Sequence, residues 1–219
     1  MLDAGEKIIG HKIGLTAKAM QELFGVDEPD YGHITDRMVL DPDLPLDLSR
    51  LIDPQIEVEP AFVLNRDLKG PGLTIEDVLD ATEYISACFE IIDSRIADWD
   101  IRLQDTVADN GSSAFIALDS GKIGPRDFDL RGLHTVLEVD GVEVETGNTT
   151  AILGHPANGV AWLANKIAQF GNHLSAGDIV LPGTCTRSYR IAGTTNARGT
   201  IEGIGSISLD FVGNPTVVK

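Results

Sequence analysis

The feature that most constrains the fold is an Asp140-Gly141 dipeptide between two alternating stretches. Residues 134–139 and 142–146 each alternate apolar and polar side chains, which is the period of a half-buried β-strand. An Asp-Gly pair between such stretches is typical of a two-residue hairpin turn, and strands joined by so short a turn are antiparallel. Further strands are predicted at 179–181 and 200–212. The second half of the chain therefore indicates an antiparallel sheet.

Two amphipathic segments predict helices beside such a sheet. Residues 156–170 place apolar side chains on one helical face and end before Gly171. Thr74, with Asp77 three residues later, resembles a capping box and predicts a helix through about Tyr84. Strands are also predicted within 52–64 and at 87–93. Because strands outnumber helices and several are joined by hairpins, we expect an α+β fold with a mixed, mostly antiparallel sheet.

Composition excludes several classes of protein. The chain has 219 residues, 42% of them hydrophobic, which fits one domain with a sizeable core. Its 34 acidic and 17 basic side chains give a net charge of −17, which argues against nucleic-acid and membrane partners because both require basic surface. Two cysteines are too few for a disulfide framework, and no signal peptide or membrane span is recognisable. We therefore expect a cytoplasmic protein.

The most informative segment for chemistry is 56–64, where two glutamates interrupt an apolar strand. Side chains alternate faces along a strand, so Glu57 and Glu59 lie on one face, about 6–7 Å apart along the chain. Glutamate is rarely buried unless it is paired or bound to a metal, and carboxylate oxygens suit Mg²⁺ or Mn²⁺. Two interpretations remain open at this point: a divalent-metal site, or a strand with a solvent-exposed polar face.

Glu90 is a third carboxylate within an apolar run, at 87–92. It would complete a facial set of three oxygen ligands if the two strands meet, and an ordinary exposed position is the alternative. Asp93 and Arg95 are expected to form a structural ion pair. The chain has no His-Glu-x-x-His motif, paired cysteine and histidine spacing, P-loop or Gly-x-Ser-x-Gly elbow, which argues against zinc, nucleotide and serine-hydrolase sites.

Several motifs in chain order carry a resemblance to a known family. They lie at residues 10–16, 28–32, 56–59, 90–95, 105–110 and 205–208. Together they resemble the 2-keto-4-pentenoate hydratase family, within the fumarylacetoacetate hydrolase superfamily, over essentially the whole chain. Residues 157–165 and 183–187 look most like the 2-oxohept-4-ene-1,7-dioate hydratases, whereas 98–110 is more similar to the hydratases of monocarboxylate dienoates.

This resemblance implies a fold, a metal and a reaction. The fold is a β-roll or sandwich of the fumarylacetoacetate hydrolase type with flanking helices, in one catalytic domain over 1–219. The metal is Mg²⁺ or Mn²⁺, held by the three glutamates at 57, 59 and 90. The reaction is hydration of a small anionic 2-hydroxy-2,4-dienoate to a 4-hydroxy-2-oxo acid in aromatic-compound catabolism. Lys12 matches the family's active-site lysine, and Asp30 matches a general acid or base. From the residues alone, a surface lysine and a turn-capping aspartate remain the alternatives.

The resemblance also indicates residues that contact substrate. Arg187 lies in a motif similar to that of the dicarboxylate hydratases, and its guanidinium would bind a distal carboxylate in a bidentate manner. A surface arginine is the alternative. Thr186, Asn110 and Ser112 are further expected substrate contacts.

Two other functions remain open at this stage. One is a 2-oxo-3-enedioate (4-oxalocrotonate) decarboxylase, which would share the fold and the metal site. The other is a non-catalytic partner subunit. A homo-oligomer is expected, and association with a related decarboxylase or hydratase is a further expectation. Family members usually begin earlier, with helices, so the chain is expected to lack that segment.

Overall fold

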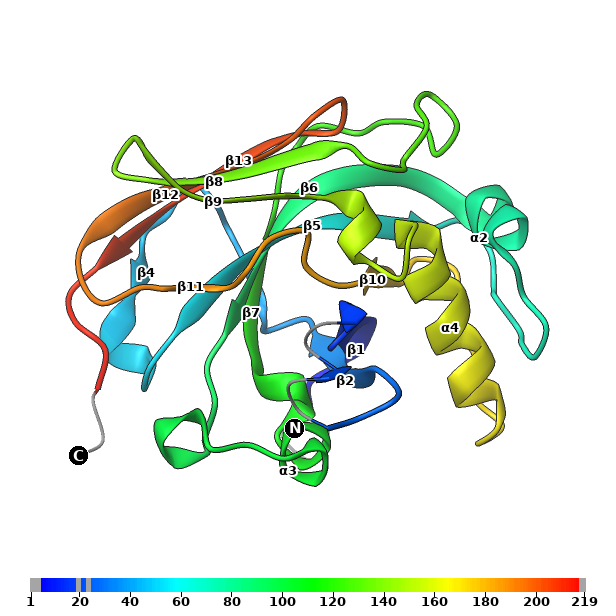
Figure 1. Ribbon diagram of the computed structural model, residues 1–219, viewed down its shortest axis with the longest axis horizontal. Helices are drawn as coiled ribbons and strands as arrows, with labels where there is room; N and C mark the ends of the chain where they lie inside the picture. Colours follow the sequence, from blue (N-terminus) through cyan, green and yellow to red (C-terminus); the bar gives the residue numbers. More distant parts are fainter. Residues whose placement is uncertain (1–4, 19–20, 23–24, 217–219) are drawn as a thin grey trace.

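Two long apolar strands form the centre of the structure. β5 (Gln55–Leu64) and β6 (Thr82–Ile92) pair antiparallel along almost their whole length. Both are rich in β-branched and aromatic residues, which favour a pleated, buried environment. The computed structural model describes residues 5–18, 21–22 and 25–216 of the chain (Figure 1).

These strands belong to a large mixed sheet with the order β2-β1-β10-β5-β6-β7-β3. β10 and β11 pair with opposite ends of the same edge of β5. The β1–β10 and β3–β7 pairs are parallel, and the remaining pairs of this sheet are antiparallel. Its other members are β1 (Ile8–Gly14), β2 (Asp30–Thr35), β3 (Val39–Leu40), β7 (Ser113–Leu118), β10 (Ile179–Leu181) and β11 (Tyr189–Arg190).

A second sheet has the order β4-β13-β12-β8-β9. Its strands are β4 (Leu46–Asp47), β8 (His134–Val139), β9 (Val142–Asn148), β12 (Thr195–Ile201) and β13 (Gly205–Val212). The hairpin predicted from the Asp-Gly pair is confirmed: β8 and β9 are antiparallel, with Val139 opposite Val142. Asp140 and Gly141 have φ angles of 50° and 76°, and a type I′ turn requires positive φ at both of these positions.

The second sheet packs on one face of the first through a dry core. Figure 1 shows β12 and β13 lying across β5 and β6. Val58 and Phe89, which face this layer, have no exposed area. Gly199 of β12 lies against both: a Cβ atom there would be 2.7 Å from the Phe89 ring and 3.0 Å from a Val58 methyl group. The absence of a side chain at Gly199 therefore sets how closely the two sheets approach.

Helices lie along the margins of the sheets. Among the residues that the structure describes, the helices include the α-helices α2 (Ile75–Ala81), α3 (Leu103–Ala108) and α4 (Pro156–Ala168) and the 3-10 helices η2 (Leu48–Arg50), η3 (Ala97–Trp99), η4 (Asn110–Ser112) and η5 (Thr149–Ala151). The predicted capping box at Thr74 and Asp77 is present. The prediction that this helix continues to Tyr84 is wrong, because β6 begins at Thr82 and Ile85 is fully buried among the strands.

The predicted fold class is confirmed. Short helices flank mixed and mostly antiparallel sheets, as expected for an α+β protein of this type. Within the described residues, no helix has the length and apolar character needed to cross a membrane.

Replacement of Gly199 tests the contact between the sheets. We expect Gly199→Ala to lower the free energy of unfolding by about 1–3 kcal/mol, because an extra methyl group must displace a buried ring or a buried β-branched side chain. Gly193→Ala is the matched control, since a Cβ there would meet only Asn214, at 3.6 Å. Urea denaturation measures both variants. Equal stability of the two would contradict this account of the interface.

Candidate active site

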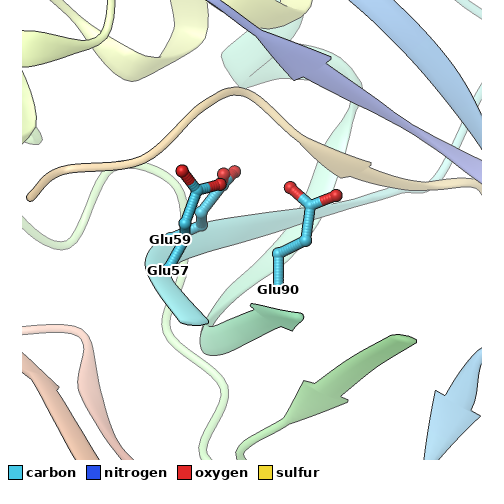
Figure 2. A group of neighbouring side chains, drawn as sticks. All are labelled: Glu57, Glu59 and Glu90. Atoms are coloured by element: carbon cyan, nitrogen blue, oxygen red, sulfur yellow. The ribbon is translucent and has the colours of Figure 1, made fainter. Parts of the chain in front are cut away.

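Three glutamates from the two central strands meet on the face of the first sheet opposite the second sheet. Glu57 pairs in register with Glu90, and Glu59 lies two residues further along the same face. One carboxylate oxygen of each lies within 4.8 Å of those of the others. Figure 2 shows the three carboxylates pointing to the same side of the strands. Glu59 and Glu90 are fully buried and Glu57 is partly buried, so the alternative of a solvent-exposed polar face is excluded.

The buried carboxylates are not satisfied by the protein alone. The Gly183 amide donates to Glu59 Oε2 at 2.8 Å, but Glu59 Oε1 and both Glu90 oxygens have no hydrogen-bond partner. Burial raises the pKa of Glu57 to about 8, with the Glu90 carboxylate adding to the effect. Burial also raises the pKa of Glu59 and of Glu90. Groups so costly to ionise in isolation indicate that a cation belongs among them.

The donor set fits a hard divalent cation. All three side chains offer oxygen, the ligand atom that Mg²⁺ and Mn²⁺ prefer, and no histidine or cysteine belongs to the cluster among the residues that the structure describes. Three protein ligands leave further coordination positions for oxygen atoms of a substrate or of water. Glu57, Glu59 and Glu90 are thus the residues that could hold a metal.

Lys12 brings positive charge to this centre from a distant strand. Its Nζ lies 3.5 Å from Glu90 Oε1 and donates to the Gly111 carbonyl at 2.9 Å. Burial by itself lowers the pKa of this ammonium, but the carboxylates of Glu90 and Asp30 raise it above its usual value, so Lys12 is charged. β1 and β6 are three strand spacings apart, which is about 14 Å in a flat sheet. The sheet curls enough for this ion pair to form.

Asp30, the other predicted catalytic residue, begins β2 and lies opposite Gly14 of β1. It is buried, and its Oδ2 accepts a hydrogen bond from the Thr106 hydroxyl of α3. Oδ1 has no hydrogen-bond partner. It lies over Gly14, where a Cβ would be 2.2 Å from this oxygen and 3.3 Å from Lys12 Nζ. Asp30 and Lys12 therefore lie on the same side of the site, and a carboxylate oxygen there is free to interact with a substrate.

The segment that carries Thr186 and Arg187 is anchored beside the carboxylates. The Gly183 amide binds Glu59, and the Cys185 amide donates to the Val58 carbonyl at 3.0 Å, between the two glutamates of β5. Thr186 is buried, and its hydroxyl donates to the Arg187 carbonyl at 3.0 Å. The Arg187 side chain is exposed. The fold thus places this segment at the site, and substrate contacts by Thr186 and Arg187 stay predictions.

Asn110 and Ser112 are largely engaged with the protein itself. The Asn110 amide accepts from the His33 N–H at 2.8 Å and donates to the His33 carbonyl at 2.9 Å. The Ser112 hydroxyl donates to Asp109 at 3.0 Å. These contacts fix the turn that carries the Gly111 carbonyl, the acceptor for Lys12. They indicate a supporting role, and direct substrate contacts by the two side chains stay untested predictions.

The expected ion pair between Asp93 and Arg95 is wrong. The Asp93 carboxylate accepts the backbone N–H groups of Ile52 and Asp53, at 2.9 and 2.7 Å. Arg95 instead pairs with Asp109 at 2.7 Å and donates to the Asp93 carbonyl. Proximity in sequence was misleading, because Asp93 ends a strand beside the 52–53 loop.

Two contributors to the site lie outside the predicted set. Thr106 holds Asp30, and the Gly183 amide holds Glu59. The motif at 105–110 pointed to the Thr106 segment but assigned this side chain no role. The contact between Thr106 and Asp30 joins residues 76 positions apart, so no local pattern could reveal it.

A buried carboxylate centre with an adjacent charged lysine, on a curled mixed sheet, fits the class of metal-dependent enzymes. Comparison with known proteins specifies the family. The model of the fumarylacetoacetate (FAA) hydrolase C-terminal domain matches residues 36–211. The chain belongs to the fumarylacetoacetate hydrolase family.

Named relatives lie in the hydratase branch of this family. The chain is 41% identical to a 2-hydroxyhexa-2,4-dienoate hydratase of Comamonas testosteroni, over 95% of this chain and 80% of the relative. It is 44% identical to a 2-keto-4-pentenoate hydratase of Paraburkholderia phymatum, over 94% and 79%. It is also 42% identical to a 2-oxo-hept-4-ene-1,7-dioate hydratase of Escherichia coli, over 95% and 80%. These names agree with the family expected from the sequence motifs.

A solved structure shows the same fold at high similarity. The 4-oxalocrotonate decarboxylase of Pseudomonas putida G7, complexed with magnesium and adipate, has a TM-score of 0.93 and 36% identity, over 96% of this chain and 80% of that one. A fumarylpyruvate hydrolase of Pseudomonas aeruginosa shares the fold at a TM-score of 0.71 and 15% identity, over 92% and 88%.

Metal binding by the three glutamates can be tested through the melting temperature of the protein. We expect Mg²⁺ or Mn²⁺ to raise the melting temperature of the wild-type chain, because a ligand that binds only the folded state stabilises it, by about 2.7 kcal/mol at 100 times Kd. Glu59→Gln is expected to lose most of this shift, since a neutral amide replaces a negatively charged carboxylate.

Glu83→Gln is the control for this measurement, because Glu83 is an exposed glutamate of the same central strand pair. It is expected to retain the full metal-induced shift. A wild-type melting temperature that does not respond to either ion would contradict the assignment of the site.

Proposed function

We propose that this chain is a hydro-lyase that adds water to a 2-hydroxy-2,4-dienoate to give a 4-hydroxy-2-oxo acid, with Mg²⁺ or Mn²⁺ as cofactor. The observation that carries the proposal is the buried set of unsatisfied carboxylates beside Lys12 and Asp30. The names of relatives more than 40% identical to the chain support the same reaction.

Glu57, Glu59 and Glu90 would hold the cation and leave coordination positions open for substrate oxygens. When bound, the cation supplies Lewis-acid stabilisation of negative charge on the C1 carboxylate and C2 oxygen of the substrate. The glutamates keep the cation fixed because their strands are paired in register and buried. The Gly183 amide adds to this by orienting Glu59.

Lys12 binds and orients the substrate. Its raised pKa keeps the ammonium protonated, so this side chain acts as a hydrogen-bond donor and a positive charge rather than as a base. The Gly111 carbonyl and Glu90 hold Nζ in place from two sides. We infer that Nζ contacts the oxygen atoms at the C1 and C2 end of the substrate.

Asp30 moves the protons. Ketonisation of the dienoate places a proton on C5 and makes C4 electrophilic, after which water adds at C4 and a proton at C3. Each step needs a group that takes or gives a proton near the carbon chain. Asp30 Oδ1 is the unpaired acceptor oxygen on the Lys12 side of the site, and we assign these transfers to it.

A decarboxylase is the second candidate, because the solved structure at 36% identity is a 4-oxalocrotonate decarboxylase. The same metal site and lysine would stabilise the enolate left by loss of carbon dioxide. The names of the relatives at 41–44% identity favour the hydratase. The presence of Lys12, Asp30 and all three glutamates in one site argues against a non-catalytic subunit.

Turnover assays separate these candidates. We expect 2-hydroxypenta-2,4-dienoate to be converted to 4-hydroxy-2-oxopentanoate in the presence of Mg²⁺ or Mn²⁺, and EDTA to abolish the conversion. Loss of dienoate absorbance and product analysis measure the hydration, and carbon dioxide release from 2-oxo-3-enedioate measures decarboxylation. Hydration at an equal rate without metal would contradict the mechanism, and carbon dioxide release alone would establish the decarboxylase.

Arg187 is the proposed determinant for a second carboxylate. The anchors at Gly183 and Cys185 tether its segment beside β5, and no ion pair occupies its side chain among the described residues. We expect Arg187→Ala to raise KM for a seven-carbon dicarboxylate by roughly 10-fold or more, because a hydrogen bond to a charged group contributes about 1.5–3 kcal/mol. KM for 2-hydroxypenta-2,4-dienoate should change little.

Arg198→Ala is the matched control, since Arg198 is an exposed arginine of the second sheet whose side chain donates a hydrogen bond to Ser206. It should leave both KM values unchanged. If Arg187→Ala changes KM equally for the two substrates, Arg187 does not bind the distal carboxylate.

A further inference from the structure

We propose that Thr106 is a positioning residue that presents Asp30 Oδ1 to the substrate. This inference deepens the proposed function and rests on it for the role of Asp30. Thr106 lies in α3, is buried, and donates its hydroxyl hydrogen bond to Asp30 Oδ2. Thr106 therefore supports the Asp30 carboxylate from α3, an element that does not belong to the β1–β2 strand pair.

The hydrogen bond distinguishes the two oxygens of Asp30. Oδ2 is engaged by Thr106, whereas Oδ1 is buried without a partner above Gly14. A carboxylate rotates readily about its Cβ–Cγ bond unless a hydrogen bond fixes it. Lys12 Nζ lies on the Oδ1 side, close to the same point above Gly14, and an ammonium there attracts either carboxylate oxygen. The Thr106 hydroxyl therefore holds the carboxylate in the orientation that leaves Oδ1 available.

The Thr106 hydroxyl can support both the ionised and the protonated form of Asp30. Thr106 Oγ1 also lies 3.3 Å from the Leu103 carbonyl, one turn earlier in α3. A hydroxyl has one proton to donate and lone pairs that accept. When Asp30 is ionised, Thr106 donates to Oδ2. When Oδ1 takes up a proton, Oδ2 keeps its lone pairs and still accepts from Thr106, so the carboxyl group keeps its orientation. Threonine at this position thus suits a carboxyl group that gains and loses a proton in each cycle.

The turn that follows α3 links this support to Lys12. Asp109, at the end of α3, is bound by Arg95 and Ser112, and Asn110 is bound to both backbone groups of His33 in β2. The Gly111 carbonyl then accepts from Lys12. One short segment, residues 106–112, therefore orients both Asp30 and Lys12.

The test compares Thr106→Val, which removes the hydroxyl at nearly constant volume, with Thr106→Ser, which keeps it. We expect Thr106→Val to lower kcat for hydration roughly 10- to 100-fold, as loss of one hydrogen bond to a charged group predicts. KM and the affinity for Mn²⁺, measured by calorimetry, should change less than threefold, because the metal ligands are untouched. Thr106→Ser should recover most of kcat. Thr146→Val, on the exposed edge strand β9, is the control and should leave kcat unchanged.

Crystal structures of the two variants give a readout that does not depend on turnover. The Asp30 carboxylate should rotate toward Lys12 in Thr106→Val and stay in place in Thr106→Ser. Full kcat in Thr106→Val, equal loss in both variants, or an unmoved carboxylate in Thr106→Val would each overturn the inference. If the wild-type chain with Mg²⁺ does not hydrate the dienoate, the proposed function fails, and the carboxylate position alone then decides whether Thr106 positions Asp30.

Discussion

The structure depends on how it stabilises three carboxylates that lie in its interior. Glu57, Glu59 and Glu90 lie in the two most buried strands, where ionised carboxylates are costly unless positive charge is close. Lys12 supplies positive charge from the protein itself. Its ammonium reaches Glu90 only because the sheet curls across β10 and β5. One ammonium does not neutralise three carboxylates. A cation among the three carboxylates would supply the missing positive charge, and the curl of the sheet brings Lys12 to the same centre.

One face of the central strands forms part of the core, and the other face forms the candidate active site. On one face, Val58 and Phe89 pack against β12 in a dry core, and Gly199 allows the close contact. On the other face, the glutamates surround a polar centre that must admit substrate. A strand keeps such different environments apart because successive side chains point in opposite directions. The packed core makes the strands rigid, and rigid strands hold the three carboxylates at fixed separations.

The sequence predicted those features that depend on interactions between residues close together in the chain. The Asp140-Gly141 hairpin, the capping box at Thr74 and the shared face of Glu57 and Glu59 all depend on neighbouring residues, and all are confirmed. The end of α2 was misplaced because the pairing of β6 with β5, a tertiary effect, overrides helical propensity from Thr82 onward. Asp93 and Arg95 were paired wrongly for the same reason: each finds a better partner from a distant loop. The family motifs predicted Lys12 and Asp30 as catalytic residues, and the structure places both beside the glutamates; the contacts that hold them in place are visible only in the folded chain.

The acidity of the chain bears on how it recognises an acid. With 34 acidic and 17 basic side chains, the overall field repels an anionic substrate. Recognition must therefore depend on positive charge concentrated at one point, where burial and low dielectric strengthen it. Lys12 supplies one such charge, and the three glutamates supply the means to hold a second in the form of a metal ion. The same carboxylates that make the protein more acidic thus offer a place for a cation. A substrate with a chelating oxygen beside its carboxylate would gain most from that cation, because two of its oxygens could bind the ion.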